Sequence, residues 1–138
     1  RVLFRSLAGE PAALEGLLEV VARAHRSARF ALGFAVHRMD HDAAVIHEAA
    51  LLHDFAEMLL WCHAPALALR IRNAQRADAT LRSVAIQRDV LGIALYEVKH
   101  ALMKAWRLPE MLRRISDAAT RTGKDFTSMD MTLFAPKP

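Results

Sequence analysis

The chain has 138 residues, of which 54% are hydrophobic and 7% aromatic, and its formal net charge is +4 at pH 7. A chain of this length forms one domain, or part of one, with a sizeable core. Its few glycines and prolines exclude collagen-like, low-complexity and loop-rich all-β chains, and its single cysteine, Cys62, excludes a disulfide framework and a cysteine-based zinc cluster. The small charge excess gives little support to nucleic-acid binding.

The sequence indicates neither secretion nor insertion into a membrane. Its N-terminus lacks the features of a secretory signal. The most apolar stretch, residues 43–61, contains five polar side chains that disfavour a membrane span: His47, Glu48, His53, Asp54 and Glu57. With one thiol in addition, we expect a cytoplasmic protein. Because the sequence starts with Arg1 rather than Met, we also expect a piece of a longer polypeptide.

Helical periodicity dominates the first half of the chain. A first helix is expected from Glu10 and Pro11 to about Arg38. Its predicted apolar face consists of Leu14, Leu17, Leu18, Val21, Phe30, Phe34 and Val36. A long buried helix should follow from about Asp42 to Cys62, with Asp40 or Asp42 as its cap and Pro65 as its stop.

Shorter helices are expected in the second half. Pro65 opens one helix, and another is capped by Thr80 and ends near Gly92. A further helix carries the apolar stripe Leu95, Val98, Leu102 and Ala105, and Pro109 opens the last one with Met111, Leu112 and Ile115 inward. The sequence therefore predicts an all-α bundle of about six or seven helices in residues 1–119, followed by a tail or edge segment in residues 120–138.

The adjacent pair His53-Asp54 is the strongest candidate for chemistry. In a continuous helix, a rotation of about 100° per residue places Glu57, Asp54 and His47 within about 120° of His53. A buried carboxylate needs a partner, a hydrogen bond or a metal ion, and imidazole with carboxylate suits Mn, Fe, Zn or Ni. The alternative is that these groups bond to neighbouring helices or face water. Cys62 has no basic neighbour in sequence and is interpreted as a small core residue.

Several segments together resemble one known family. The segment Leu51-Leu52-His53-Asp54-Phe55-Ala56-Glu57 resembles the signature helix of the HD superfamily. The frame around it consists of Arg26-Ser27 with the alanine-rich stretch that follows, residues 49–60, residues 87–92 and Trp106-Arg107-Leu108-Pro109. Over about residues 22–117, this frame is similar to the HD-related output domain, the HDOD family of bacterial signalling proteins. The resemblance implies an HD-like helical bundle.

The resemblance also implies a set of metal ligands. HD phosphohydrolases bind metal through an early His, the His-Asp pair and a later Asp. Here His53 and Asp54 match the central pair, Asp117 is a possible last ligand, and either His25 or Arg26 occupies the first position. Glu57 and His47 are possible supporting residues beside the pair.

The chain departs from the family pattern at three places. Ala56-Glu57 replaces the usual Gly-Lys, Leu95 stands where a His is common, and the paired histidines expected near Asp117 are absent. HDOD proteins as a group resemble HD enzymes whose metal site is incomplete. The resemblance therefore implies a vestigial site.

Two functions remain open, with the non-catalytic one preferred. The first is a regulatory module of a bacterial cytoplasm that needs no cofactor and contacts another signalling protein or domain. The alternative is a phosphomonoesterase or phosphodiesterase with Mn, Fe, Zn or Ni held by His25, His53, Asp54 and Asp117.

Other chemistries have weaker support. The arginines at positions 70, 72, 76, 82 and 88 are interrupted by acidic residues and lack aromatics for base stacking, so a nucleic-acid partner is not expected. Neither a phosphate-binding glycine loop nor a Gly-x-Ser-x-Gly motif is present. The sequence leaves the oligomeric state open.

Overall fold

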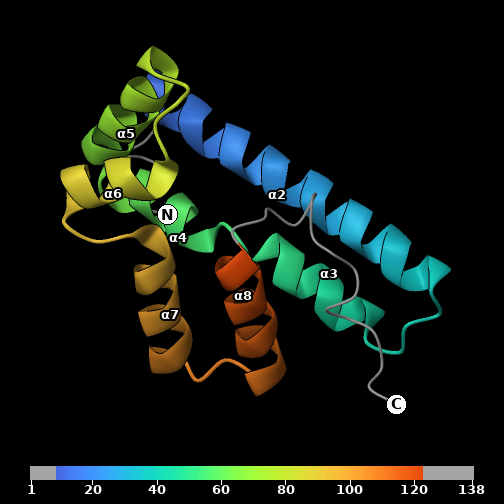
Figure 1. The fold of residues 1–138 in the computed structure, drawn as a ribbon. Helices are drawn as coiled ribbons and strands as arrows, with labels where there is room; N and C mark the ends of the chain where they lie inside the picture. The colour runs from blue at the N-terminus through green and yellow to red at the C-terminus, as the bar shows by residue number, and fades with distance from the viewer. Residues whose placement is uncertain (1–8, 123–138) are drawn as a thin grey trace. The chain divides into compact units, whose positions relative to one another are not determined.

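The computed structural model describes residues 9–122, which contain helices α2 to α8 (Figure 1). They span Pro11–His37 (α2), Ala43–Leu51 (α3), Phe55–His63 (α4), Pro65–Ala77 (α5), Ser83–Leu91 (α6), Leu95–Ala105 (α7) and Glu110–Thr122 (α8). All regular secondary structure in this part of the chain is helical, which confirms the predicted all-α class. Of the described helices, none combines the length and the apolarity needed to cross a bilayer.

Packing contacts divide the chain into two compact units. Among the described residues, unit 1 contains the first half of α2, up to Arg23, and the segment Asp54–Ala105 with α4 to α7. Unit 2 contains Ala24–His53, with the second half of α2 and α3, and residues 106–122 with α8. Because α8 continues to Thr122 and the rest of the predicted tail lies outside the described residues, the division at residue 119 stays a prediction.

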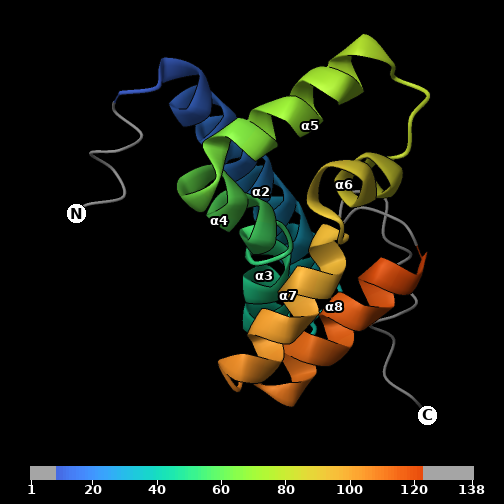
Figure 2. The same ribbon diagram turned by 90° about the vertical axis from the view of Figure 1, so that its left-hand side faces the viewer.

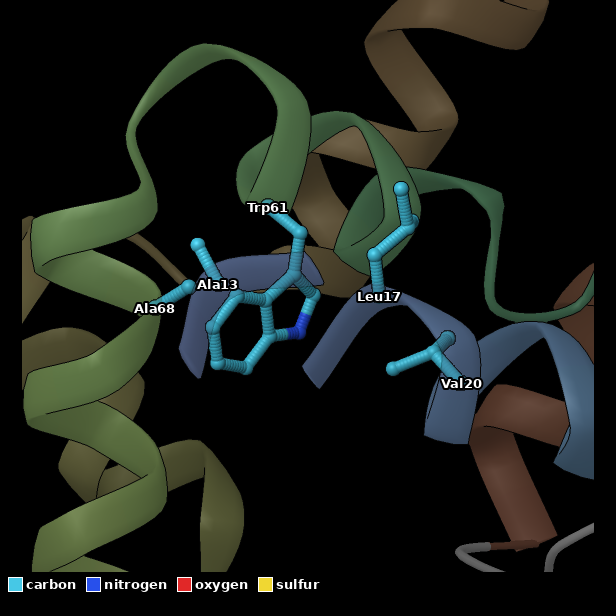
Figure 3. Close-up of a cluster of buried hydrophobic side chains, with 5 residues drawn as sticks. All are labelled: Ala13, Leu17, Val20, Trp61 and Ala68. Carbon is cyan, nitrogen blue, oxygen red and sulfur yellow. The ribbon is translucent and has the colours of Figure 1, made fainter. Parts of the chain in front are cut away.

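The core of unit 1 is built around one tryptophan. The ring of Trp61, on α4, lies between α2 and α5 and is only 3% exposed (Figure 3). Its buried neighbours are Ala13, Leu17 and Val20 on α2 and Ala68 on α5. The Arg72 guanidinium lies 6.0 Å from the ring centroid, within the range of a cation–π contact. Within the same unit α4 packs against α5 and α7, and α5 against α6 (Figure 2).

Gly16 makes room for the Trp61 ring. A Cβ added at Gly16 would lie 2.5 Å from Trp61 Cζ2 and 2.6 Å from Cζ3, far inside van der Waals contact. Glycine costs a helix interior roughly 0.5–1 kcal/mol relative to alanine. Here the close packing of a large aromatic ring against the α2 backbone offsets that cost.

The core of unit 2 is built mainly from small residues. Ala28, Ala31 and Ala35 of α2 form a buried cluster with Ile46 and Ala50 of α3. The second half of α2 therefore packs against α3 mainly through short alanine side chains. In the same unit, α8 packs against α3 and buries its residues Leu112 and Ile115, as predicted, whereas Met111 is exposed (Figure 1).

The expectation of one helix from Asp42 to Cys62 is wrong. The chain leaves helical hydrogen bonding at residues 52–54, so that α3 ends at Leu51 and α4 begins at Phe55. The Leu52 N–H bonds to the Glu48 carbonyl at 2.9 Å, and the His53 N–H bonds to the Ala50 carbonyl at 3.3 Å, which tightens the chain at the end of α3. The predicted stop at Pro65 is confirmed in a modified form, because α4 ends at His63 and Pro65 starts α5.

The predicted apolar face of the first helix is wrong at Leu18, which is 57% exposed, and throughout its second half. Phe30, Phe34 and Val36 are 61%, 55% and 60% exposed, and the alanines on the opposite side are buried instead. The stripe predicted for α7 is also displaced, since Lys99 and Met103 are its buried side chains. Periodicity found these helices, but residue size misled the choice of the buried face.

Two predicted turns have different outcomes. Gly92 ends α6 in the left-handed conformation, with φ of 73°, as expected for a glycine stop. Thr80 is not the cap of α6, whose N-cap position is Arg82. The Thr80 hydroxyl and N–H instead donate to Asp78 Oδ1, at 2.6 and 2.9 Å, and lower the pKa of that carboxyl.

Candidate functional site

The break between α3 and α4 determines where the His53-Asp54 pair lies. Both residues are partly buried, and Asp54 occupies the N-cap position of α4. An N-cap aspartate ordinarily accepts hydrogen bonds from the backbone N–H groups of its own helix. The Asp54 side chain makes no such cap bond, and its carboxylate accepts a hydrogen bond from a residue of another element.

That residue is Arg23 on α2. Its Nε atom donates to Asp54 Oδ2 at 2.9 Å, and a terminal nitrogen donates to Glu57 Oε2 at 2.6 Å. Glu57 lies in the first turn of α4, so both carboxylates belong to the start of one helix. The planar guanidinium therefore bridges two acidic side chains and joins the first half of α2 to the start of α4 within unit 1.

The electrostatics of this group are balanced internally. Partial burial would lower the pKa of Arg23, but the negative charges of Glu57 and Asp54 and their hydrogen bonds outweigh it and raise the pKa above its ordinary value. Arg23 stays cationic at every accessible pH. The two carboxylates are further stabilised by the positive end of the α4 dipole.

The other predicted site residues, His25, His47 and Asp117, belong to unit 2. His25 is exposed on α2, and His47 is partly buried on α3. Within the described part of the chain, neither makes a hydrogen bond or ion pair. Asp117 is partly buried on α8. Because α3 and α4 are separate helices, the predicted common sector of His47, His53, Asp54 and Glu57 does not exist on one continuous helix.

The predicted metal ligands are divided between the two units, with Asp54 in unit 1 and His25, His53 and Asp117 in unit 2. Between residues 9 and 122, no group of three or more His, Cys, Asp or Glu side chains is arranged to hold a metal ion. A metal hydrolase needs at least three protein ligands and an open position for water. Asp54 and Glu57 each give an oxygen to Arg23 instead. The ligand roles of His53, Asp54, His25 and Asp117 stay predictions.

Two residues that the sequence analysis underrated are Arg23 and Lys99. Arg23 is separated from Asp54 by 31 positions, and no local motif links them. Lys99, on α7, is only 4% exposed. The sequence signal for Lys99 was its position within the apolar stripe of α7, because a buried lysine requires a polar environment.

The thiol and the arginines of unit 1 have mainly structural surroundings. Cys62 packs against the Trp61 cluster, and burial raises the pKa of its thiol, which disfavours a reactive thiolate. Arg72 bonds to Glu19 at 2.7 Å, and Arg76 lies 3.6 Å from the same carboxylate. Arg88 pairs with Glu97 at 3.4 Å. Three of the five arginines considered for nucleic-acid binding are therefore neutralised by acidic side chains.

Comparison with known proteins gives the family. The family model of the HDOD domain matches residues 2–121, which is most of the chain. The chain belongs to the HDOD domain family. The family assignment predicted from the His53-Asp54 segment and its frame is thereby confirmed. No curated protein and no solved structure matches the chain.

Proposed function

We propose that this HDOD chain is a non-catalytic regulatory module in which Arg23 occupies Asp54, the carboxylate that an HD enzyme would present to a metal, together with the neighbouring Glu57. The observation that carries the proposal is the pair of Arg23 contacts, at 2.9 Å to Asp54 and 2.6 Å to Glu57. The proposed output is a contact with another signalling protein or domain, or a ligand-dependent change in helix packing. The proposed setting is a bacterial cytoplasm, as the family implies.

The physical reason lies in charge compensation. Partly buried carboxylates are costly unless a cation or hydrogen-bond donors compensate them. In an HD enzyme the divalent metal provides that compensation and also activates water. A guanidinium provides the compensation alone, since it cannot polarise water as a Lewis acid. Arg23 therefore supports the fold of this segment without supplying a reactive centre.

The same contacts suggest how the module responds to a signal. Arg23 joins α2 to the start of α4, and α4 carries Trp61, the centre of the unit 1 core. Any anion that competes for Arg23 would free Asp54 and Glu57 and loosen the start of α4. A change at this ion pair would thus reach the Trp61 cluster within a single short helix.

Turnover assays test the proposal directly. The chain, purified without chelators, is assayed with p-nitrophenyl phosphate and bis(p-nitrophenyl) phosphate in the presence of Mn, Fe, Zn or Ni. We expect no turnover above that of His53→Ala and Asp54→Asn. The alternative, a metal-dependent phosphohydrolase, requires stoichiometric metal and turnover that both substitutions abolish. Such a result would overturn the regulatory proposal.

A further inference from the structure

The outward side of α2 in unit 2 has an unusual composition. We define the aromatic–arginine face as Arg26, Arg29, Phe30, Gly33, Phe34 and His37, all of which are exposed. At about 100° per residue these positions cover an arc of about 140° on the helix. The buried alanines of the unit 2 core lie on the opposite side. The face is therefore continuous and belongs to one unit only.

On this half of α2 the small side chains are buried and the large apolar side chains are exposed, which is the reverse of the usual arrangement. Phe30 and Phe34 are 61% and 55% exposed, while Ala28, Ala31 and Ala35 are buried. Burying a phenylalanine is worth roughly 1.5–3 kcal/mol, and alanine gains much less. The chain forgoes this gain at two positions one helical turn apart. Contiguous exposed apolar side chains of this kind mark interaction surfaces.

Gly33 gives a second and independent indication. It lies in the interior of α2, where glycine weakens a helix, and a Cβ added there would meet nothing within 4 Å. No described neighbour therefore requires a glycine at this position, in contrast to Gly16. A missing side chain between two exposed phenylalanines leaves a notch where the backbone of a partner can approach closely.

The spacing of the face indicates the shape of its occupant. Arg26, Phe30, Gly33 and His37 follow one another at intervals of four, three and four residues. This is the spacing of a seam between two packed helices, where the side chains of one helix enter the gaps of the other. An extended strand would need unpaired backbone groups, which the interior of a helix does not offer. The occupant that fits is a helix.

The charges indicate its chemistry. Residues 20–39 contain four arginines and no aspartate or glutamate. Arg26 and Arg29 are exposed, and among the described residues neither makes an ion pair. Exposed arginines beside an apolar stripe complement a partner with acidic side chains at the edge of its own stripe. A second basic surface of the same kind would be repelled.

We propose that the aromatic–arginine face binds an amphipathic helix of another protein, with an apolar stripe flanked by aspartates or glutamates. The inference rests on the proposed regulatory function and names its contact surface. Phe30 and Phe34 would supply the apolar contact, and Gly33 would allow the partner helix to approach closely. Arg26 and Arg29 would select partners with acidic side chains.

The test uses the full chain and two synthetic helices that differ only in charge. Both carry leucines at i, i+3, i+4 and i+7 spacing, flanked by glutamates in one peptide and by lysines in the other. By fluorescence anisotropy, the acidic peptide should bind at least about tenfold more tightly than the basic one, and the difference should shrink as salt is added. Phe30→Ser and Arg26→Glu should each weaken binding of the acidic peptide by about tenfold or more.

Matched variants separate binding from folding. Leu18→Ser removes an equally exposed apolar side chain of α2 in unit 1, and Arg114→Glu reverses an exposed charge on α8. Both should bind like the parent chain. Gly33→Ala should raise the melting temperature and weaken binding, a combination that a purely structural role does not produce.

The following outcomes would contradict the proposal that the aromatic–arginine face binds an acidic amphipathic helix. Equal affinity for the two peptides, no binding of either, or equal losses in the control variants would overturn it. Two further results would also overturn it: attachment to phosphatidylglycerol vesicles, or self-association in light scattering, if Phe30→Ser abolishes the effect. The occupant of the face would then be a membrane or a second copy of this chain. Turnover that depends on His53 would instead overturn the proposed function, whatever the peptides do.

Discussion

The two units of this chain handle their large apolar side chains in opposite ways. Unit 1 buries Trp61 against a glycine on α2, whereas unit 2 buries alanines of the same helix and exposes Phe30 and Phe34. Unit 1 also ends α6 with a glycine in the left-handed conformation. Unit 2 places Met39 and Arg107 in that conformation, with φ of 53° and 52°. The two units therefore differ in where they place their aromatic rings and in the residues that take the left-handed conformation.

The difference indicates where selection for stability gives way to selection for function. Local choices that disagree with the fold concentrate at functional surfaces. In unit 2 the exposed phenylalanines, the open Gly33 and the left-handed Met39 all belong to the second half of α2 or to its end. These features of the second half of α2 support the contact surface proposed for that helix, and substitutions in both units test the contrast.

The largest effect is expected at Trp61. Trp61→Ala removes the centre of the unit 1 core and should lower the free energy of unfolding by about 3–5 kcal/mol. Phe34→Ala, the matched aromatic of unit 2, should change it by no more than about 0.5 kcal/mol because the ring is mostly exposed. Urea denaturation followed by circular dichroism measures both. Equal losses would show that the two units do not differ in this way.

The two interior glycines of α2 give the next largest contrast. Gly16→Ala places a methyl group inside the Trp61 ring and should destabilise the chain by about 1–3 kcal/mol. Gly33→Ala meets no neighbour and should stabilise it by roughly 0.5–1 kcal/mol. Urea denaturation followed by circular dichroism measures both changes in the free energy of unfolding. Effects of the same sign would contradict the opposite roles assigned to these glycines.

Arg23 should contribute less than the core residues. Arg23→Gln removes its ion pairs with Asp54 and Glu57 and should cost about 1–2 kcal/mol, since the guanidinium is half exposed. Arg26→Gln, three residues further along α2 and without an ion pair, should cost no more than about 0.5 kcal/mol. A double-mutant cycle with Glu57→Gln measures the coupling. Zero coupling would contradict the proposed role of Arg23 as the replacement for a metal.

The smallest effect is expected at the end of α2. The Met39 N–H bonds to the Val36 carbonyl and the Asp40 N–H to the Ala35 carbonyl, both at 2.9 Å, which forms a Schellman motif with Met39 in the glycine position. Met39→Gly should raise the melting temperature, by an amount equivalent to about 0.5–1 kcal/mol. Gly92→Ala in unit 1 should lower it. A stabilising Gly92→Ala would contradict the contrast between the two helix ends.

Local sequence signals predicted most of the helices, most of their ends and the family, but not the division of residues 43–63 into two helices. Periodicity along the chain and the stops at Pro65 and Gly92 are local signals, and so is the motif around His53-Asp54. These features depend on residues close together in sequence, so they can be recognised without knowledge of the packing. The apolar content of α2 was visible as well, although its buried side was not.

Only the tertiary structure decided which faces are buried and which charges meet. Hydrophobicity favoured Phe30 and Phe34 as core residues, but helix α3 packs closely against the small alanines. Asp54 lies at the break at residues 52–54, and its carboxylate accepts a hydrogen bond from Arg23, which is 31 residues away in sequence. The reason is that burial and ion pairing depend on neighbours brought together by folding, which a local pattern does not contain.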